Sequence, residues 1–184
     1  MTPGRVHLLY GLAGSGKSTL ARLLCVEGRA VRFTLDEWML RLYPGLHFES
    51  PEYGARAAEV RELIWSTAEQ VVTAGVDVVL DWNSWSIERR AWAVARASAV
   101  AAPVTLHVLS TSLEESSQRA AARTAAGEGF FHPVTRSGIE HLAGLMQEPD
   151  ASRRVHDFAP LKRAVSGRCE RPDNQRGENL RRAR

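Results

Sequence analysis

Near its N-terminus this 184-residue chain reads Gly11-Leu12-Ala13-Gly14-Ser15-Gly16-Lys17-Ser18-Thr19. The glycine, lysine and hydroxyl residues match the spacing G-x-x-x-x-G-K-S/T without exception. An apolar segment, Arg5–Tyr10, precedes this stretch, and a segment with helical periodicity follows it from about Lys17 to Glu27. A buried strand, a glycine-rich loop and a helix in this order are typical of a phosphate-binding loop. We therefore expect residues 11–19 to form a P-loop.

The residue types in this loop are suited to binding the phosphates of a nucleoside triphosphate. Glycines allow the backbone N–H groups to turn inward around an anion, and the following helix N-terminus adds partial positive charge. Lys17 is expected to reach the β- and γ-phosphates of ATP, and the Ser18 hydroxyl to bind Mg²⁺. The chain has only two lysines, and Lys17 is the only one before Lys162. We therefore expect ATP and Mg²⁺ as cofactors, with all nine loop residues around the nucleotide and Lys17 also catalytic.

Further along the chain, strand and helix patterns alternate. Strands are predicted at Ala30–Leu35, Val76–Leu80 and Val104–Leu109, and helices from Ser50-Pro51 to Gly75, Ser86 to about Val100, Ser112 to about Ala126 and Thr135 to near Met146. This order predicts an α/β P-loop NTPase fold, a doubly wound and mainly parallel sheet of four to five strands with flanking helices and a short lid. After Pro149, His156–Pro160 and Ala164–Val165 are too short and charged to predict a fifth strand.

Two acidic residues follow predicted strands. Asp36 follows the second strand, and Asp81 follows the third. Ligands of doubly wound sheets bind outside the carboxyl ends of the strands. We expect Asp36 to orient the acceptor hydroxyl and accept its proton, and Asp81 to bind the metal with Ser18. Helix capping or simple surface exposure is the alternative for both acids, and the adjacent Glu37 is expected to favour the helix dipole.

Arg119 and Arg123 share one face of a predicted helix that leads into Gly127–Phe131, a candidate lid. Both are expected to contact the phosphates of ATP, and Arg123 to act in catalysis. A solvated basic face is the alternative.

Several aromatic residues lie close in sequence to the two acids. The residues expected to line an acceptor pocket are Trp38, Tyr53, Arg56, Trp82 and Trp85. Aromatic residues often belong to the core instead, and this is the expectation for Trp65 and Trp92.

With these features in place, the chain resembles the AAA_33 P-loop kinases, which are similar to chloramphenicol phosphotransferase, zeta toxins, gluconate kinase and the kinase half of polynucleotide kinases. The resemblance rests on the P-loop, Asp36, the Val-Val-Leu-Asp-Trp segment at residues 78–82 and the Arg119/Arg123 helix. It spans about residues 4–148. It implies ATP use, Asp36 as the base or acceptor-orienting group, and arginine contacts to phosphate. Such kinases usually finish with a fifth strand and an adenine-contacting loop, which cannot be read here.

The composition indicates one domain and a basic tail. Residues 151–184 hold ten basic and four acidic residues. Because the whole chain has a net charge of +3, residues 1–150 carry a net charge of −3. We expect a P-loop kinase domain at 1–150 and a weakly ordered tail at 151–184. The acidic body argues against nucleic acid as a partner. Two cysteines, no long apolar run and no leader pattern favour a cytoplasmic protein without membrane contact, whose oligomeric state stays open.

The leading hypothesis is an ATP- and Mg²⁺-dependent phosphotransferase acting on a hydroxyl of a small molecule. The alternatives within enzymes are a polynucleotide 5′-hydroxyl kinase and a toxin-like sugar-nucleotide kinase. The alternative outside enzymes is an ATP-binding module without turnover.

Overall fold

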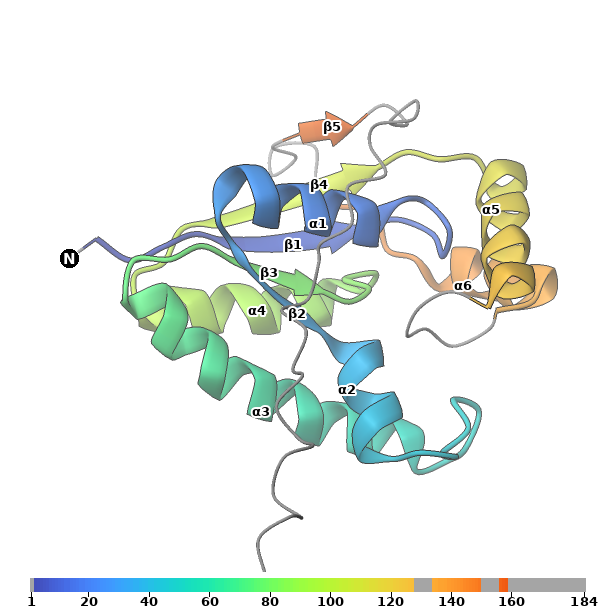
Figure 1. The fold of residues 1–184 in the computed structure, drawn as a ribbon, viewed down its shortest axis with the longest axis horizontal. Coiled ribbons are helices and arrows are strands. Elements are labelled where there is room, and N and C mark those ends of the chain that lie inside the picture. Colours follow the sequence, from blue (N-terminus) through green and yellow to red (C-terminus); the bar gives the residue numbers. More distant parts are fainter. Residues whose placement is uncertain (1, 128–133, 150–155, 159–184) are drawn as a thin grey trace, which may run out of the picture.

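The computed structural model describes residues 2–127, 134–149 and 156–158. In this part of the chain, five parallel strands form one sheet in the order β2-β3-β1-β4-β5 (Figure 1). The strands are β1 (Val6–Tyr10), β2 (Val31–Thr34), β3 (Val78–Asp81), β4 (Val104–Leu109) and β5 (His156–Phe158). The predicted α/β P-loop fold is confirmed.

Helices cover both faces of the sheet. They are α1 (Lys17–Gly28), α2 (Leu35–Leu42), α3 (Tyr53–Thr73), α4 (Ile87–Ala99), α5 (Leu113–Ala126) and α6 (Arg136–Leu145). Helix α1 lies on one face, and α3 and α4 lie on the other (Figure 1). Consecutive residues of one strand serve the two faces, since Leu8 packs in the α3/α4 core and Leu9 in the smaller α1 core.

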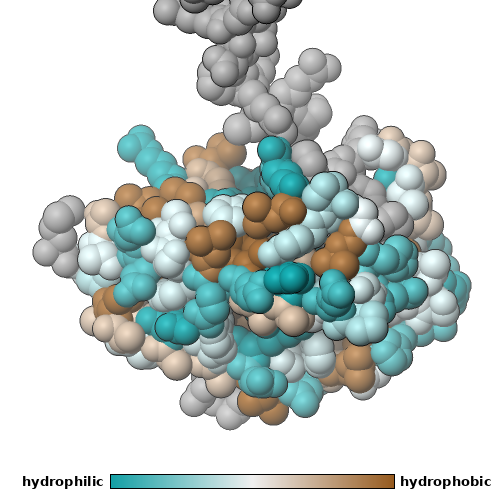
Figure 2. Space-filling model, turned by 90° about the horizontal axis from the view of Figure 1, so that it is seen from below, coloured by the Kyte–Doolittle hydropathy of each residue, from teal (hydrophilic) through white to brown (hydrophobic). Residues whose placement is uncertain are grey.

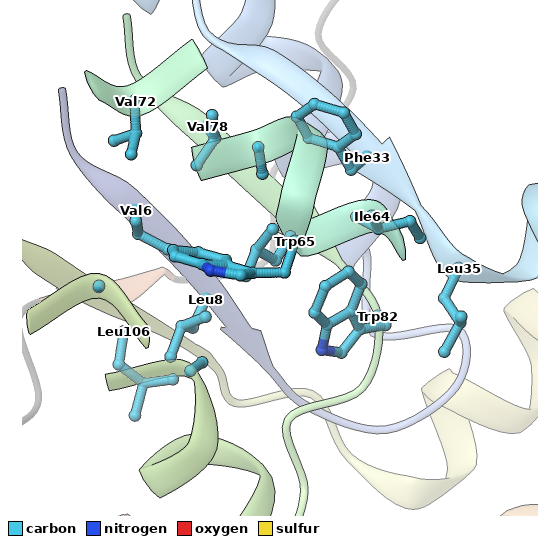
Figure 3. Close-up of a cluster of buried hydrophobic side chains, with 14 of the residues drawn as sticks. Val6, Leu8, Phe33, Leu35, Ile64, Trp65, Val72, Val78, Trp82 and Leu106 are labelled. Carbon is cyan, nitrogen blue, oxygen red and sulfur yellow. The ribbon is translucent and has the colours of Figure 1, made fainter. Parts of the chain in front are cut away.

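The larger core lies between the sheet and helices α3 and α4. Figure 3 shows part of this core, with Trp65 of α3 near Val6 and Leu8 of β1, and Ile64 of α3 near Leu35. The side chains of Trp65, Ile64 and Leu8 are at most 3% exposed. Burial of both sheet faces explains why β3 is a continuous apolar run, Val78-Val79-Leu80, before it ends in Asp81.

Register brings the ends of the central strands together. Leu8 of β1 pairs with Leu80 of β3, and Thr34 of β2 pairs with Asp81. All three strands run the same way, so their carboxyl ends, the P-loop and Asp36 meet at one edge of the sheet.

Three predicted helix starts are confirmed by their caps. The side chains of Ser86, Ser112 and Thr135 each accept a hydrogen bond from a backbone N–H three residues on, at 3.2 Å. Such caps satisfy N–H groups that the first helical turn leaves unpaired.

The predicted cap at Ser50 is wrong. Helix α3 begins at Tyr53, and Glu52 precedes it. The Ser50 hydroxyl accepts from the Glu52 N–H at 3.4 Å, so it serves a local turn instead of a helix. The second strand also ends early, at Thr34, because Leu35 already begins α2.

The sequence left a fifth strand after Pro149 open, and the structure has one, β5. Strand β5 runs parallel to β4, with His156 opposite His107 and Phe158 opposite Leu109. The edge of β4 supplies its backbone partners, and three residues are too few for periodicity to reveal a strand. The rest of the predicted tail, and residues 128–133 of the predicted lid region, lie outside the described residues.

From the side on which α3 lies, hydrophobic side chains form small groups between hydrophilic ones (Figure 2). Across the described residues, no helix combines the length and the apolarity that crossing a membrane requires.

Candidate functional site

The P-loop connects β1 to α1 and is packed tightly against α5. Gly14 and Gly16 have φ angles of 83° and 100°, a left-handed conformation that favours glycine. A Cβ on Gly14 would lie 2.1 Å from the backbone oxygen of Ser116 in α5. The Thr111 hydroxyl also donates to the carbonyl of Ser15 at 3.2 Å. The loop therefore has its shape held by α5 and by the segment that leads into it.

Lys17 is turned back over the loop. Its ammonium group donates to the carbonyl oxygens of Gly11 at 2.9 Å and Leu12 at 2.7 Å. Burial lowers the pKa of Lys17 to about 8, although the charges of Asp81 and Asp36 oppose this effect. The loop thus holds a cation where the anion of a nucleotide is expected to bind.

Asp81 sits directly across from Ser18. The Ser18 hydroxyl donates to Asp81 Oδ1 at 3.4 Å. Arg32 on β2 donates two hydrogen bonds to the other carboxylate oxygen, Oδ2, one from Nε at 2.7 Å and one from Nη2. Arg32 thereby fixes the orientation of a carboxylate that is only 5% exposed.

This pair is suited to Mg²⁺. A hydroxyl and one carboxylate are enough when water and phosphate oxygens complete an octahedral shell. Such a site needs no larger cluster, and among the described residues no group of three or more His, Cys, Asp and Glu side chains is placed to hold a metal.

Asp36 occupies the first turn of α2, immediately after β2. Its charge opposes the lowered pKa values of both Lys17 and Arg123, and it helps to raise the pKa of Tyr53 to about 12, mainly a result of burial. Asp36 therefore lies among a lysine, an arginine and a tyrosine from three other elements. The neighbouring Glu37 instead bonds to Arg41 at 2.8 Å.

The two arginines of α5 have different surroundings. Burial lowers the pKa of Arg123, and the charges of Asp36 and Asp81 act on it in the opposite direction. Arg119 is paired with Glu115, one turn earlier on the same helix. Of the two predicted phosphate contacts, Arg123 is the one brought together with the acids.

The five predicted acceptor residues do not share one environment, because some lie in the core or at its margin and one is exposed at the surface. Trp82 is 5% exposed and packs into the core near Trp92, with ring centroids 6.3 Å apart (Figure 3). Arg56 is exposed, donates to Glu59 at 3.1 Å and lies over the ring of Tyr43.

Trp38 and Tyr53 are half-buried at the margin of the core. Trp85, also half-buried, lies under the guanidinium of Arg89, which is 4.9 Å from the ring centroid. The structure thus connects Tyr53 with Asp36, and Trp85 with Arg89.

Sequence reasoning missed Arg32 and Arg89. An arginine inside a short strand is a signal for Arg32, because a charge there needs a partner on an adjacent strand. Arg89 gave no such signal, since a basic residue in the first turns of an amphipathic helix is ordinary.

A cavity of about 430 Å³ opens beside the P-loop on the β4 side. Its described lining includes Gly11, Leu12, Ser110, Thr111, Met146 and Glu148. None of the predicted acceptor residues lines this cavity, so it is separate from the predicted acceptor pocket.

The comparison with protein families gives a clear result. A family model described as an AAA domain, AAA_33, matches residues 6–149. The chain belongs to this family. The AAA_33 resemblance seen in the sequence is thereby confirmed.

Solved structures place this AAA_33 protein among P-loop kinase folds. It is 16% identical to a gluconokinase from Sinorhizobium meliloti 1021, with a TM-score of 0.55 over 83% of this chain and 80% of that one. It is 23% identical to the Mycobacterium tuberculosis APS kinase CysC, in a complex with AMPPNP and APS, with a TM-score of 0.54 over 81% and 85% of the two chains.

A third similar structure is the Pnkp1/Rnl/Hen1 RNA repair complex, with 24% identity and a TM-score of 0.63. There the match covers 79% of this chain but only 44% of the other, so this AAA_33 protein spans less than half of that chain. No curated protein sequence matches. At these identities the likeness establishes the fold alone.

Proposed function

We propose that this protein transfers the γ-phosphate of ATP to a hydroxyl group of a small-molecule acceptor. The observation that carries the proposal is the meeting of Lys17, Asp36, Asp81 and Arg123 around one P-loop. These residues come from α1, α2, β3 and α5. The two cations can neutralise charge on the phosphates of ATP. Of the two acids, one can bind Mg²⁺ and the other can accept the proton of the acceptor hydroxyl.

On the nucleotide side, the backbone N–H groups of Gly11–Thr19 bind the phosphates and Lys17 moves from its own carbonyls to the β- and γ-phosphates. Arg123 approaches from α5 and stabilises negative charge on the transferring group. Ser18 and Asp81 would hold Mg²⁺, which would neutralise negative charge on the phosphates of ATP. Arg32 keeps Asp81 turned toward Ser18.

On the acceptor side, Asp36 takes the proton of the hydroxyl. The hydroxyl oxygen attacks the γ-phosphorus, the bond from that phosphorus to the bridging oxygen breaks, and ADP leaves with the bond electrons. The products are ADP, a phosphate monoester and the proton on Asp36. Positioning and electrostatics supply most of the rate, because the transition state asks for little covalent chemistry from the protein.

Trp38, Tyr53 and Trp85 form the acceptor side of this site in our proposal. Tyr53 supports the placement, because the charge of Asp36 acts on its hydroxyl. Trp82 and Arg56 are left out, because one is in the core and the other is paired with Glu59 at the surface.

Thermal melting with and without Mg·ATP tests the nucleotide site first. We expect stabilisation in the wild type and none in Lys17→Ala; absence of stabilisation in the wild type would contradict the proposal. Transfer from γ-labelled ATP is then assayed with sugars, sugar acids, antibiotics, nucleosides and 5′-hydroxyl oligonucleotides. A labelled small molecule supports the proposal, a labelled oligonucleotide supports a polynucleotide kinase, and nucleotide binding without any product supports the module without turnover.

A further inference from the structure

Two arginines from neighbouring helices lie beside the proposed acceptor site. Arg61 belongs to α3 and Arg89 to the first turn of α4. The helices are tied together next to these residues, because Glu62 of α3 accepts hydrogen bonds from Trp92 at 2.9 Å and Arg96 at 2.6 Å, both on α4. This contact brings the two helix faces close to each other.

Neither arginine of this pair forms an ion pair with a carboxylate among the described residues. Burial lowers the pKa of both arginines, and the charge of Arg61 lowers that of Arg89 further. The Arg89 guanidinium donates a 3.4 Å hydrogen bond to the carbonyl of Asn83 and lies over the ring of Trp85. The charge of Glu62 acts on Arg61 and that of Glu88 on both arginines, but both acids are exposed to solvent and Glu62 is paired with Arg96.

Other arginines of the protein show the usual arrangement. Arg32, Arg96 and Arg119 are each paired with a carboxylate. Two half-buried like charges without such a partner are costly, because burial removes water while repulsion remains. An anionic ligand between them removes both costs.

The location of the two arginines indicates that the anion they bind is part of the acceptor molecule. Arg89 lies over the ring of Trp85, one of the proposed acceptor residues, and the charges of both Arg89 and Asp36 act on Tyr53. A molecule whose hydroxyl reaches Asp36 therefore extends past Tyr53 toward Arg89. The P-loop has its own cations, Lys17 and Arg123, on which Asp36 also acts.

We propose that Arg61 and Arg89 bind an anionic group of the acceptor, so that the substrate is a hydroxyl compound carrying a carboxylate or a phosphate monoester. The inference rests on the proposed function for the direction in which the acceptor lies. Guanidinium groups suit such oxyanions because they offer paired, planar N–H donors. The stacking of Arg89 on Trp85 orients one of these groups in advance.

The test uses the full chain saturated with Mg·AMPPNP, which keeps added anions out of the P-loop. Inorganic phosphate and acetate are titrated separately at constant ionic strength, and binding is followed by calorimetry and melting temperature. We expect saturable binding of at least one anion, weakened roughly ten- to hundredfold in Arg89→Gln and in Arg61→Gln. Stronger binding of phosphate indicates a phosphorylated acceptor, and stronger binding of acetate indicates a carboxylic acid.

Arg136→Gln is the matched control, because Arg136 is exposed and is neutralised by Glu114 and Glu140. It should bind both anions as the wild type does. Without ligand, Arg89→Gln should melt no lower than the wild type, because the substitution removes repulsion; a purely structural arginine would lower the melting temperature. No saturable anion binding, or binding equal in the wild type and Arg89→Gln, overturns the inference.

Failure of the proposed function gives a different result. If Mg·AMPPNP does not bind, the same titrations are made with Lys17→Ala, whose P-loop has lost its cation. Phosphate or acetate binding that disappears in Lys17→Ala/Arg89→Gln still supports the arginine site, and binding that does not depend on Arg89 contradicts it.

Discussion

Lys17 has a buried ammonium group whose pKa is lowered to about 8, and this predicts a pH-dependent nucleotide affinity. Below that value the free protein already carries the charge that the phosphates need. Above it the lysine must take up a proton when ATP binds, so affinity for Mg·AMPPNP should fall roughly tenfold per pH unit. Calorimetry between about pH 7 and 9, in buffers of different ionisation enthalpy, measures both affinity and proton uptake. Constant affinity over this range would show that the free lysine stays charged, and Lys17→Met should lack the dependence.

Gly14 is predicted to tolerate no side chain. In Gly14→Ala the new Cβ would meet the Ser116 oxygen at 2.1 Å, at a φ of 83° that already disfavours alanine by about 1–2 kcal/mol. We expect a lower melting temperature together with weaker Mg·ATP binding. Gly144→Ala in α6 is the control, since a Cβ there meets nothing within 4 Å and alanine favours a helix. Equal behaviour of the two variants would show that the close contact with α5 is unimportant.

How far single residues could be predicted depended on whether their signal was local. Lys17 and Ser18 belong to a fixed motif, and Asp36 and Asp81 follow strands, so their places at the sheet edge could be inferred. Trp82 follows a strand as well, but the sequence could not tell that its side chain turns inward to the core. Arg89 becomes notable only when α3 brings Arg61 near it.

At the scale of elements, α5 packs against the P-loop and carries Arg123. Because Arg123 lies with Asp36 and Asp81 while Arg119 is paired with Glu115, the two arginines should differ in effect. Arg123→Gln should weaken Mg·AMPPNP binding about tenfold and ADP binding less, since the γ-phosphate is its expected contact. Arg119→Gln should cause a smaller loss. Equal losses for both nucleotides and both variants would place the γ-phosphate elsewhere.

Helices and strands could be predicted where the sequence signal lies within the residues of the element itself. Ser86, Ser112 and Thr135 each mark a helix start through a cap, and β4 has the predicted bounds. Strand β5 depends on the free edge of β4, which is distant in sequence, so its own three residues gave no usable pattern. The Ser50 prediction failed because one serine–proline signal serves turns as well as helices.

At the scale of the whole molecule, a buried histidine pair should make stability depend on pH. His7 of β1 lies 2.8 Å from His107 of β4, and its other ring nitrogen is 3.4 Å from Asp77. Burial lowers the pKa of His7 from the usual 6.5, against the opposing effect of Asp77. As pH falls through 6.5, the unfolded chain gains a proton that the folded chain resists, so the free energy of unfolding decreases until the lower folded pKa is reached.

Urea unfolding over a pH series measures this effect. One proton contributes a slope of at most about 1.4 kcal/mol per pH unit. His7→Gln should flatten the slope near neutral pH, whereas His47→Gln should leave it unchanged, because the His47 side chain is 70% exposed. An unchanged slope in His7→Gln would mean that His7 is not the group responsible.

The central claim for the molecule is that one edge of the sheet both holds ATP and removes a proton from an acceptor. The most direct measurement compares turnover and Mg·ATP affinity in the wild type, Asp36→Asn and the matched Glu37→Gln, with the acceptor that the panel identifies. Asp36→Asn should lower kcat about a hundred- to ten-thousandfold and leave the Kd for Mg·ATP nearly unchanged, while Glu37→Gln should alter neither greatly. Full turnover in Asp36→Asn would contradict the account.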